Sequence, residues 1–309
     1  MTRVLITGGS GFIGSHLTET LLDRGFTVRV VSRSSNPANL QDLTNRNHLE
    51  VYVGDLLNNF RFDEALEGVD LVIHLFWSNL PRNKRSFLRE DLANSVGVGI
   101  ALLEACVRSG VRKFIFPSSG GTVYGIPEEI PIKEDHAEIP ISSYGLTKIV
   151  FEKYLHLFSS WHDLDFTILR LSNVYGPKQN LEVSQGVVSH WIKSILKAGR
   201  IELWGDGSIV RDYIYIEDAV SAFIPCLKIT TSNTYNISSN EGHSLTTIIK
   251  ILSEDLDLAF EIERKKGDRT DVPTNILDNS LARLELDWEP ICPLPDGIMK
   301  TYEFLRAIY

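Results

Sequence analysis

Tyr144 and Lys148 are the two side chains whose types and spacing most directly indicate catalysis. They are four residues apart, so on a helix they share one face. An ammonium group beside a phenol favours the phenolate and lowers the tyrosine pKa from about 10. Such a tyrosine can exchange a proton with a hydroxyl or ketone while a hydride moves at the same carbon. Because such pairs are common and usually structural, this interpretation depends on a hydride carrier bound nearby.

A glycine-rich stretch near the N-terminus predicts the site of that carrier. Thr7-Gly-Gly-Ser-Gly-Phe-Ile-Gly14 lies between an expected strand and an expected helix. The glycines permit a tight turn and a close backbone approach to a pyrophosphate, and the helix start offers free N–H groups to the phosphates. Because strand, turn and helix occur in the right order, the stretch indicates a dinucleotide. The residues expected to contact it are Gly8, Gly11, Phe12, Ile13 and Gly14.

The end of the next expected strand bears on which dinucleotide is bound. NAD-binding proteins usually carry an acidic residue there, but this strand ends in Ser32-Arg33. An arginine pairs with a 2′-phosphate that a carboxylate would repel, so these residues favour NADP(H), with NAD(H) as the alternative. Asp55 and Leu56 follow the third expected strand. There Asp55 is placed either to meet the adenine ring or simply to close a turn.

Strands and helices alternate along the first half of the chain and would position these residues. Strands are expected at 3–7, 27–31, 49–53, 71–75, 113–117 and 166–171, and helices at 13–24, 92–109 and 144–159. This alternation predicts crossover connections and a parallel sheet. We therefore predict an α/β fold with a Rossmann-type, doubly wound parallel sheet.

The pattern becomes shorter and less regular after Gly176. We expect a dinucleotide-binding domain at 1–176 and a smaller α/β substrate-binding lobe at 177–309. Segments near 210–226 are expected to pack back on the first domain.

The composition and charge of the chain argue against several classes of protein. The formal net charge of −9 disfavours a nucleic-acid partner. The three cysteines, Cys106, Cys226 and Cys292, are far apart and indicate neither disulfides nor a metal site. No apolar run reaches about 18 residues and the N-terminus lacks a small-residue cleavage site, so we expect no membrane partner and a cytoplasmic location.

Several stretches together resemble the extended short-chain dehydrogenase/reductase family, in its branch of nucleotide-sugar epimerases, dehydratases and reductases. They are the glycine turn, 144–148, Ser118-Ser-Gly-Gly-Thr-Val-Tyr-Gly125, 169–177, 204–218 and 269–273. The resemblance covers nearly the whole chain. It implies that Tyr144 and Lys148 are catalytic, that the substrate is a nucleotide-diphosphate sugar, and that the protein is a homodimer.

The same resemblance implies roles for four residues of the second half. It places Asn173 at the substrate and Arg211 at the nucleotide diphosphate. Arg269 and Asp271 match positions near the phosphates and the nucleotide ribose. Arginines at such positions would supply positive charge in an otherwise acidic protein.

The stretch after the fifth expected strand departs from the family pattern at Gly120. The family usually carries a serine or threonine there, three residues before the valine of Val-Tyr-Gly. The hydroxyl polarises the substrate oxygen. We expect Ser119 to supply it in this chain, with Thr122 as the second choice.

The residues that follow Gly120 restrict the reaction. Gly121, Thr122 and Val123 offer neither the acid pair of 4,6-dehydratases nor the additional cysteine of members that epimerise C3 and C5. Ser32-Arg33 slightly favours reduction of a dTDP-4-keto-6-deoxyhexose, as in the synthesis of bacterial surface-polysaccharide (O-antigen) sugars. The alternative is a UDP- or dTDP-hexose 4-epimerase with bound NAD. A third interpretation, motivated by Gly120, is a catalytically inactive dinucleotide-binding regulatory protein.

Overall fold

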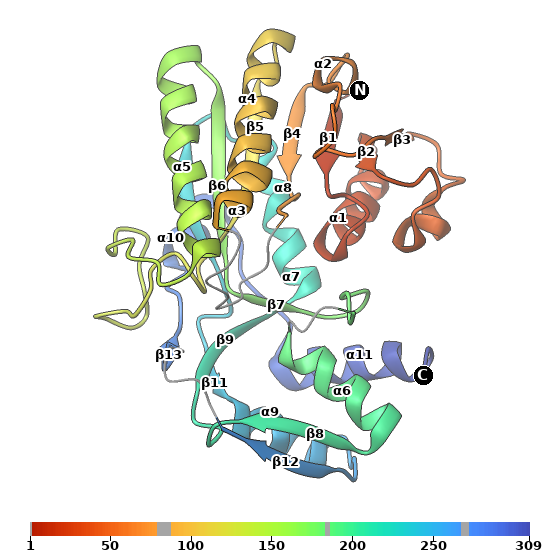
Figure 1. Ribbon diagram of the computed structural model, residues 1–309, viewed down its shortest axis with the longest axis vertical. Coiled ribbons are helices and arrows are strands. Elements are labelled where there is room, and N and C mark those ends of the chain that lie inside the picture. The colour runs from red at the N-terminus through yellow and green to blue at the C-terminus, as the bar shows by residue number, and fades with distance from the viewer. Residues whose placement is uncertain (1, 79–87, 183–185, 267–271) are drawn as a thin grey trace.

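The computed structural model of the chain describes residues 2–78, 88–182, 186–266 and 272–309. Its centre is a seven-stranded parallel sheet with the order β10-β6-β5-β4-β1-β2-β3 (Figure 1). The strands are β1 (Arg3–Thr7), β2 (Thr27–Ser32), β3 (Leu49–Val53), β4 (Leu71–His74), β5 (Lys113–Ser119), β6 (Asp165–Leu171) and β10 (Asn233–Ile237). The predicted Rossmann-type α/β fold is confirmed, since the order reverses beside β1 as in dinucleotide-binding sheets.

Helices cover both faces of this sheet because its strands are apolar on both sides. Along β1, Val4 and Ile6 belong to one core cluster, whereas Leu5 belongs to the other. The first cluster includes side chains of α1 (Phe12–Asp23), α7 (Ile216–Ser221) and α8 (Phe223–Cys226). The second includes side chains of α2 (Phe62–Ala65), α4 (Val98–Ser109) and α5 (Ser143–His162), and Figure 1 shows α4 and α5 side by side along β5 and β6.

The segment before α4 differs from the expected single helix at 92–109. It consists of α3 (Leu88–Asp91), the π-helical turn η2 (Leu92–Gly97) and then α4, which ends at Gly110 with φ 71°. Such π turns are frequent near functional sites. Here the turn places Ser95 beside the loop after β4, where its hydroxyl lies 2.8 Å from that of Ser78.

The combined segment Leu88–Ser109 is long and apolar enough to cross a membrane by length and composition alone. In the structure it packs on α5 and α2, and Leu102, Leu103 and Cys106 are fully buried in the core. A core helix passes the same length and composition test.

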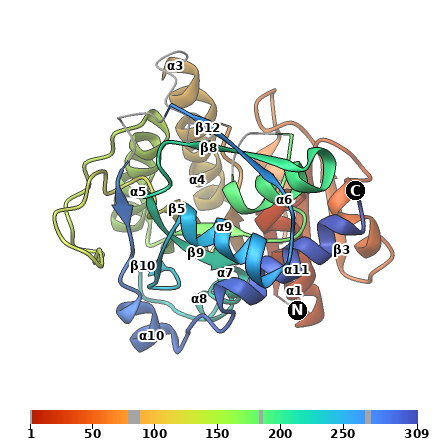
Figure 2. The same cartoon turned by 90° about the horizontal axis from the view of Figure 1, so that it is seen from below.

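The second half of the chain forms a smaller lobe, drawn below the large sheet in Figure 1 and facing the viewer in Figure 2. Strands β7 (Asn173–Tyr175), β9 (Val210–Tyr215), β11 (Gly242–Ser244) and β13 (Thr274–Asn275) form one sheet, and β8 (Arg200–Trp204) pairs with β12 (Glu261–Lys265). Besides α7 and α8, the helical elements of this half are α6 (Val187–Ala198), α9 (Leu245–Lys250), η3 (Ile251–Asp255), α10 (Ser280–Leu286) and α11 (Leu294–Arg306). The first half also contains the 3₁₀ helix η1 (Ala38–Leu43).

Two connections between the halves bear on the predicted division at residue 176, which stays a prediction. The edge strand β10, not expected from the sequence, joins the large sheet in parallel with β6. Helix α7, within the segment expected to pack back, lies against α1. Both contacts place parts of the second half on the first.

Candidate active site

The glycine turn joins β1 to α1 at the carboxyl edge of the sheet. Gly8 has φ +72°, and its carbonyl accepts a hydrogen bond of 3.0 Å from the N–H of Gly11. A Cβ on Gly14 would lie 2.3 Å from that same carbonyl oxygen, so only glycine permits this packing of turn and helix. The amide of Asn39 donates to the Ser10 carbonyl at 3.2 Å and supports the turn from outside.

The start of α1 is free to meet an anion. The helix begins after Gly11 without a side-chain cap, Gly11 is exposed, and Phe12 and Ile13 are half-buried in the first turn. Uncapped N–H groups and the positive end of the helix dipole favour phosphate oxygens. The residues present therefore fit a dinucleotide, with the pyrophosphate held by the backbone from Gly8 to Gly14.

Arg33 and Asp55 approach each other at the ends of β2 and β3. The Asp55 carboxylate accepts hydrogen bonds from the Leu57 N–H at 3.1 Å and the Asn58 amide at 2.6 Å. These bonds, followed by the charge of Arg33, hold the pKa of Asp55 below its usual value. Arg33 is exposed and so accessible to a ligand, whereas Asp55 closes a turn.

The neighbours of this pair are structural. Ser32 is buried, and its hydroxyl accepts from the Ser34 N–H at 3.2 Å. Leu56 is buried under the turn. A hollow beside it is lined by residues that include Tyr52, Gly54 and Asp55.

Tyr144, Lys148 and Ser119 come together where β5 ends and α5 begins. The Ser142 hydroxyl caps α5 by accepting from the Gly145 N–H at 3.1 Å, which places Tyr144 in the first turn. The side chain of Ser119, the last residue of β5, faces the Tyr144 phenol closely enough to lower its pKa. The Lys148 ammonium donates to the Pro117 carbonyl at 2.9 Å and lies 5.6 Å from the centre of the tyrosine ring.

Burial dominates the electrostatics of this cluster. It raises the pKa of Tyr144 to about 12, although the Ser119 hydrogen bond opposes the rise. It lowers the pKa of Lys148 to about 7, although the charge of Glu152 opposes the fall. The expectation that Lys148 lowers the tyrosine pKa in the complex with a dinucleotide stays a prediction, and in the ligand-free arrangement burial sets the direction of the shift.

The two candidate hydroxyls differ in their environment. The Thr122 hydroxyl donates to the Ser119 carbonyl at 3.4 Å within its own turn. Of these two residues, Ser119 is the one that lies against the Tyr144 phenol. Gly120, where the family usually carries the hydroxyl, is buried. Ser119 as the hydroxyl that acts on the substrate stays a prediction, with Thr122 as the second choice.

Asn173 and Arg211 lie on paired strands of the smaller sheet. The Asn173 amide donates to the Asp212 carbonyl at 3.1 Å, and a Cβ on Gly121 would lie 4.0 Å from that amide. Asn173 is therefore next to the turn after β5. Arg211 is half-buried and donates to the carbonyls of Val210 and Val272 at 2.9 and 2.7 Å. Arg269 and Asp271 lie outside the described residues.

The sequence analysis did not include Trp77, which follows β4 at the same edge of the sheet. Its ring lies over the Lys148 ammonium, 4.2 Å from ring centre to nitrogen. One feature of the sequence could have indicated Trp77: it is an aromatic residue directly after the buried strand β4. The neighbouring strands β1 and β5 both end in candidate site residues.

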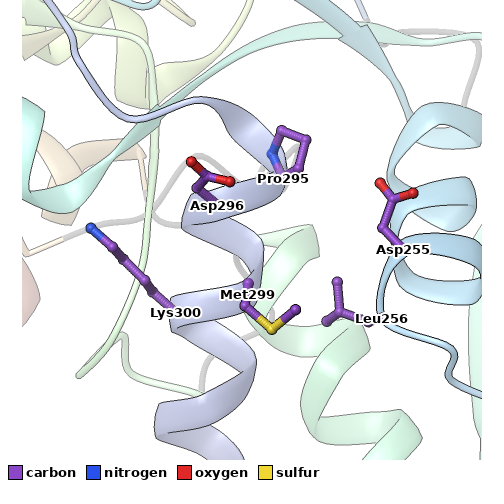
Figure 3. Close-up of a pocket in the computed structure, with 6 residues that line it drawn as sticks. All are labelled: Asp255, Leu256, Pro295, Asp296, Met299 and Lys300. Carbon is purple, nitrogen blue, oxygen red and sulfur yellow. The ribbon is translucent and has the colours of Figure 1, made fainter.

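Two further observations concern sites of other kinds. A pocket between η3 and α11 is lined by Asp255, Leu256, Pro295, Asp296, Met299 and Lys300 (Figure 3). It contains no residue of the cluster around Tyr144. Within the described ranges, no group of three or more His, Cys, Asp and Glu side chains is arranged to hold a metal ion.

A Rossmann sheet, a glycine turn and a Ser-Tyr-Lys cluster at one edge define the class of dinucleotide-dependent oxidoreductases. The chain belongs to the NAD dependent epimerase/dehydratase family, whose pattern it matches over residues 4–238. It is thus an enzyme of the NAD-dependent nucleotide-sugar epimerase and reductase group, as the resemblance implied.

Relatives from two reaction types are similar to the chain along its length. It is 32% identical to a UDP-glucose 4-epimerase of Mycolicibacterium smegmatis over 314 residues, covering 98% of each chain. It is also 32% identical to a dTDP-4-dehydro-6-deoxyglucose reductase of Escherichia coli over 311 residues, again with 98% of each covered. Sequence identity alone does not separate the two reactions.

Solved structures agree with the fold. A UDP-glucose 4-epimerase of Thermotoga maritima with UDP-glucose has a TM-score of 0.92 and 31% identity, with 99% of each chain covered. A UDP-glucuronic acid 4-epimerase of Bacillus cereus, in complex with UDP-glucuronic acid and NAD, has a TM-score of 0.91 and 28% identity over the full length of both chains. Neither these structures nor the relatives support the NADP preference expected from Ser32 and Arg33.

Proposed function

We propose that this protein is a nucleotide-sugar 4-epimerase that works with tightly bound NAD on a UDP-hexose. The side chain of Ser119 beside the phenol of Tyr144, with Lys148 on the same helix face, carries the proposal. Relatives and solved structures named as 4-epimerases support this reaction over the reduction that Ser32 and Arg33 favoured.

Each residue of the cluster has one task in this proposal. NAD, when bound along the glycine turn, supplies a hydride acceptor and donor. Tyr144 takes the proton of the sugar C4 hydroxyl and later returns it. Ser119 orients that hydroxyl through its own hydrogen bond, and the positive charge of Lys148 opposes the rise that burial imposes on the pKa of Tyr144.

The second half of the chain would hold the nucleotide part of the substrate. Asn173 lies beside the turn after β5 and is proposed to contact the sugar. Arg211 is proposed to contact the diphosphate, because a guanidinium pairs with phosphate oxygens in two parallel hydrogen bonds. Arg269 and Asp271 are proposed to act near the phosphates and the ribose.

Reduction of a dTDP-4-keto-6-deoxyhexose is the second candidate. The observation in its favour is the exposed Arg33, with no acidic residue at the end of β2. The E. coli relative named as a reductase is equally similar to the chain as the M. smegmatis epimerase. A catalytically inactive binding protein is the third candidate.

One experiment separates the three candidates. The purified protein is incubated with UDP-glucose, UDP-N-acetylglucosamine and UDP-glucuronic acid, and separately with dTDP-4-keto-6-deoxyglucose plus NADH or NADPH. A 4-epimer formed without net change in the dinucleotide supports the proposal. Consumption of NADH or NADPH with the keto sugar instead supports reduction, and binding without any turnover supports the third candidate.

A further inference from the structure

The Lys148 ammonium is enclosed by aromatic rings rather than by carboxylates. Its nitrogen lies 4.2 Å from the centre of the Trp77 ring and 4.5 Å from that of Phe116. The side chain is only 4% exposed. In the part of the chain that the structure describes, Lys148 forms no salt bridge. The rings of Trp77 and Phe116, with the Pro117 carbonyl, therefore replace part of its lost hydration.

Trp77 is held in this position by contacts on its other sides. The indole N–H donates to the Thr147 hydroxyl at 3.3 Å, and that hydroxyl donates to the Tyr144 carbonyl at 2.9 Å. The Trp77 ring also packs on Phe116 and Phe151, with centres 5.3 and 5.7 Å apart. The indole thus connects the loop after β4 to the helical turn that carries both Tyr144 and Lys148.

Glu152, whose charge favours the charged form of Lys148, is shared with a second cation. Glu152 is one turn further along α5, but its carboxylate pairs with Arg170 on β6 at 2.6 Å. His74, the last residue of β4, has its pKa lowered to about 3 by burial and is neutral in the working range. Tyr144 contributes a neutral phenol. The ring faces of Trp77 and Phe116 therefore act beside Glu152 in favouring a cation here.

We propose that Trp77 is a positioning residue of the active site. Its ring face keeps the Lys148 ammonium charged and in place, while its N–H fixes the ring to α5. The effect of Trp77 on catalysis rests on the proposed function, because a charged Lys148 matters only where Tyr144 must lose a proton. The effect of Trp77 on the Lys148 pKa does not, since it is a property of the protein without any ligand.

The sign of the effect follows from the chemistry. A cation–π contact stabilises only the charged lysine, so removing the ring must lower the Lys148 pKa further below its usual value of about 10.4. If charged Lys148 promotes turnover, the loss of activity on the basic side of the pH profile must then begin at a lower pH. A loss of packing alone would reduce activity without moving this limb.

The test measures the Lys148 pKa directly in the ligand-free protein. Lysine labelled with ¹³C at Cε is titrated by NMR, and the Lys148 signal is assigned by its absence in Lys148→Met. We expect Trp77→Leu to lower the Lys148 pKa by about half a unit to one unit, and Trp77→Phe to lower it less. Trp161→Leu, which removes an exposed tryptophan from the far end of α5, should leave it unchanged.

A second measurement keeps the inference testable if Trp77→Leu does not fold. 5-Fluorotryptophan in the parent protein keeps the shape of the ring but weakens its negative face, so it should also lower the Lys148 pKa. An unchanged pKa in folded Trp77→Leu, or with 5-fluorotryptophan, would overturn the inference.

The outcome is separable from that of the proposed function. A pKa shift in a protein that converts no UDP-sugar would leave the role of Trp77 toward Lys148 intact and remove the epimerase proposal. Epimerase activity in a protein whose Lys148 pKa does not respond to substitution of Trp77 would support the proposed function and remove the role of Trp77. Where both hold, the basic limb of the profile of kcat against pH moves to lower pH, more in Trp77→Leu than in Trp77→Phe.

Discussion

Leu277 occupies the space that a side chain on residue 120 would need. A Cβ on Gly120 would lie 2.3 Å from Cδ1 of Leu277, which is itself fully buried. This contact gives a physical reason for the glycine at a position where related enzymes carry a hydroxyl. It also leaves Ser119, one residue earlier, as the hydroxyl that contacts Tyr144.

Gly120→Ser should therefore destabilise the protein rather than restore a missing catalytic group. Overpacking of this kind costs about 1–3 kcal/mol in the free energy of unfolding. Urea unfolding of Gly120→Ser, Leu277→Ala and the double variant measures it. The double variant should be more stable than the sum of the two single losses predicts. Strict additivity would show that the two residues do not compete for space.

Tyr144→Phe should reduce turnover by about 10²–10⁴-fold and leave dinucleotide binding within about twofold, because only the proton path is removed. Stopped assays of the nucleotide sugar and a titration of NAD by fluorescence measure the two effects. Ser119→Ala should show a smaller loss of turnover, whereas Thr122→Val should stay closer to the parent. A Tyr144→Phe protein with activity near that of the parent would remove tyrosine from the mechanism.

Arg33→Ala should distinguish the two dinucleotides. The guanidinium at the end of β2 is the group that a 2′-phosphate would approach, so its loss should weaken NADPH by about tenfold and leave NADH almost unchanged. Isothermal titration of both compounds provides the ratio. An equal loss for NADH and NADPH would mean that Arg33 acts on the Asp55 turn and not on a phosphate.

Glu152→Gln should be strongly destabilising, because Arg170 is only 2% exposed and its charge would lose its main partner. Breaking such a buried pair costs about 3 kcal/mol or more. The control is Glu254→Gln, the same substitution in an exposed i,i+4 pair with Lys250 that is worth less than about 0.5 kcal/mol. Equal unfolding free energies for the two variants would contradict a structural role for the buried pair.

The sequence predicted those features that depend on local order along the chain. Strand, glycine turn and helix follow one another from β1 to α1, and Tyr144 and Lys148 share a face of α5 because helical spacing requires it. The ends of β1, β4 and β5 meet at one edge because parallel strands place them there. These rules sufficed for the Rossmann sheet.

Features that arise from contacts between distant segments were not predictable in the same way. β10 completes the sheet although its five residues carry two asparagines and a threonine, because β6 offers a free edge. The contact of Leu277 with Gly120 joins residues more than 150 positions apart. The burial that raises the pKa of Tyr144 was likewise not visible in the sequence, because helix spacing places the ammonium of Lys148 but does not show how far the phenol is desolvated.

The most direct test of the central claim follows the hydrogen on C4 of the substrate. A 4-epimerase removes this hydrogen and returns it to the other face of the same carbon. We predict that UDP-[4-²H]glucose is converted to its 4-epimer with the deuterium retained at C4, in protein that receives no added dinucleotide after purification. No epimer from any UDP-hexose, together with consumption of NADPH by dTDP-4-keto-6-deoxyglucose, would contradict the account.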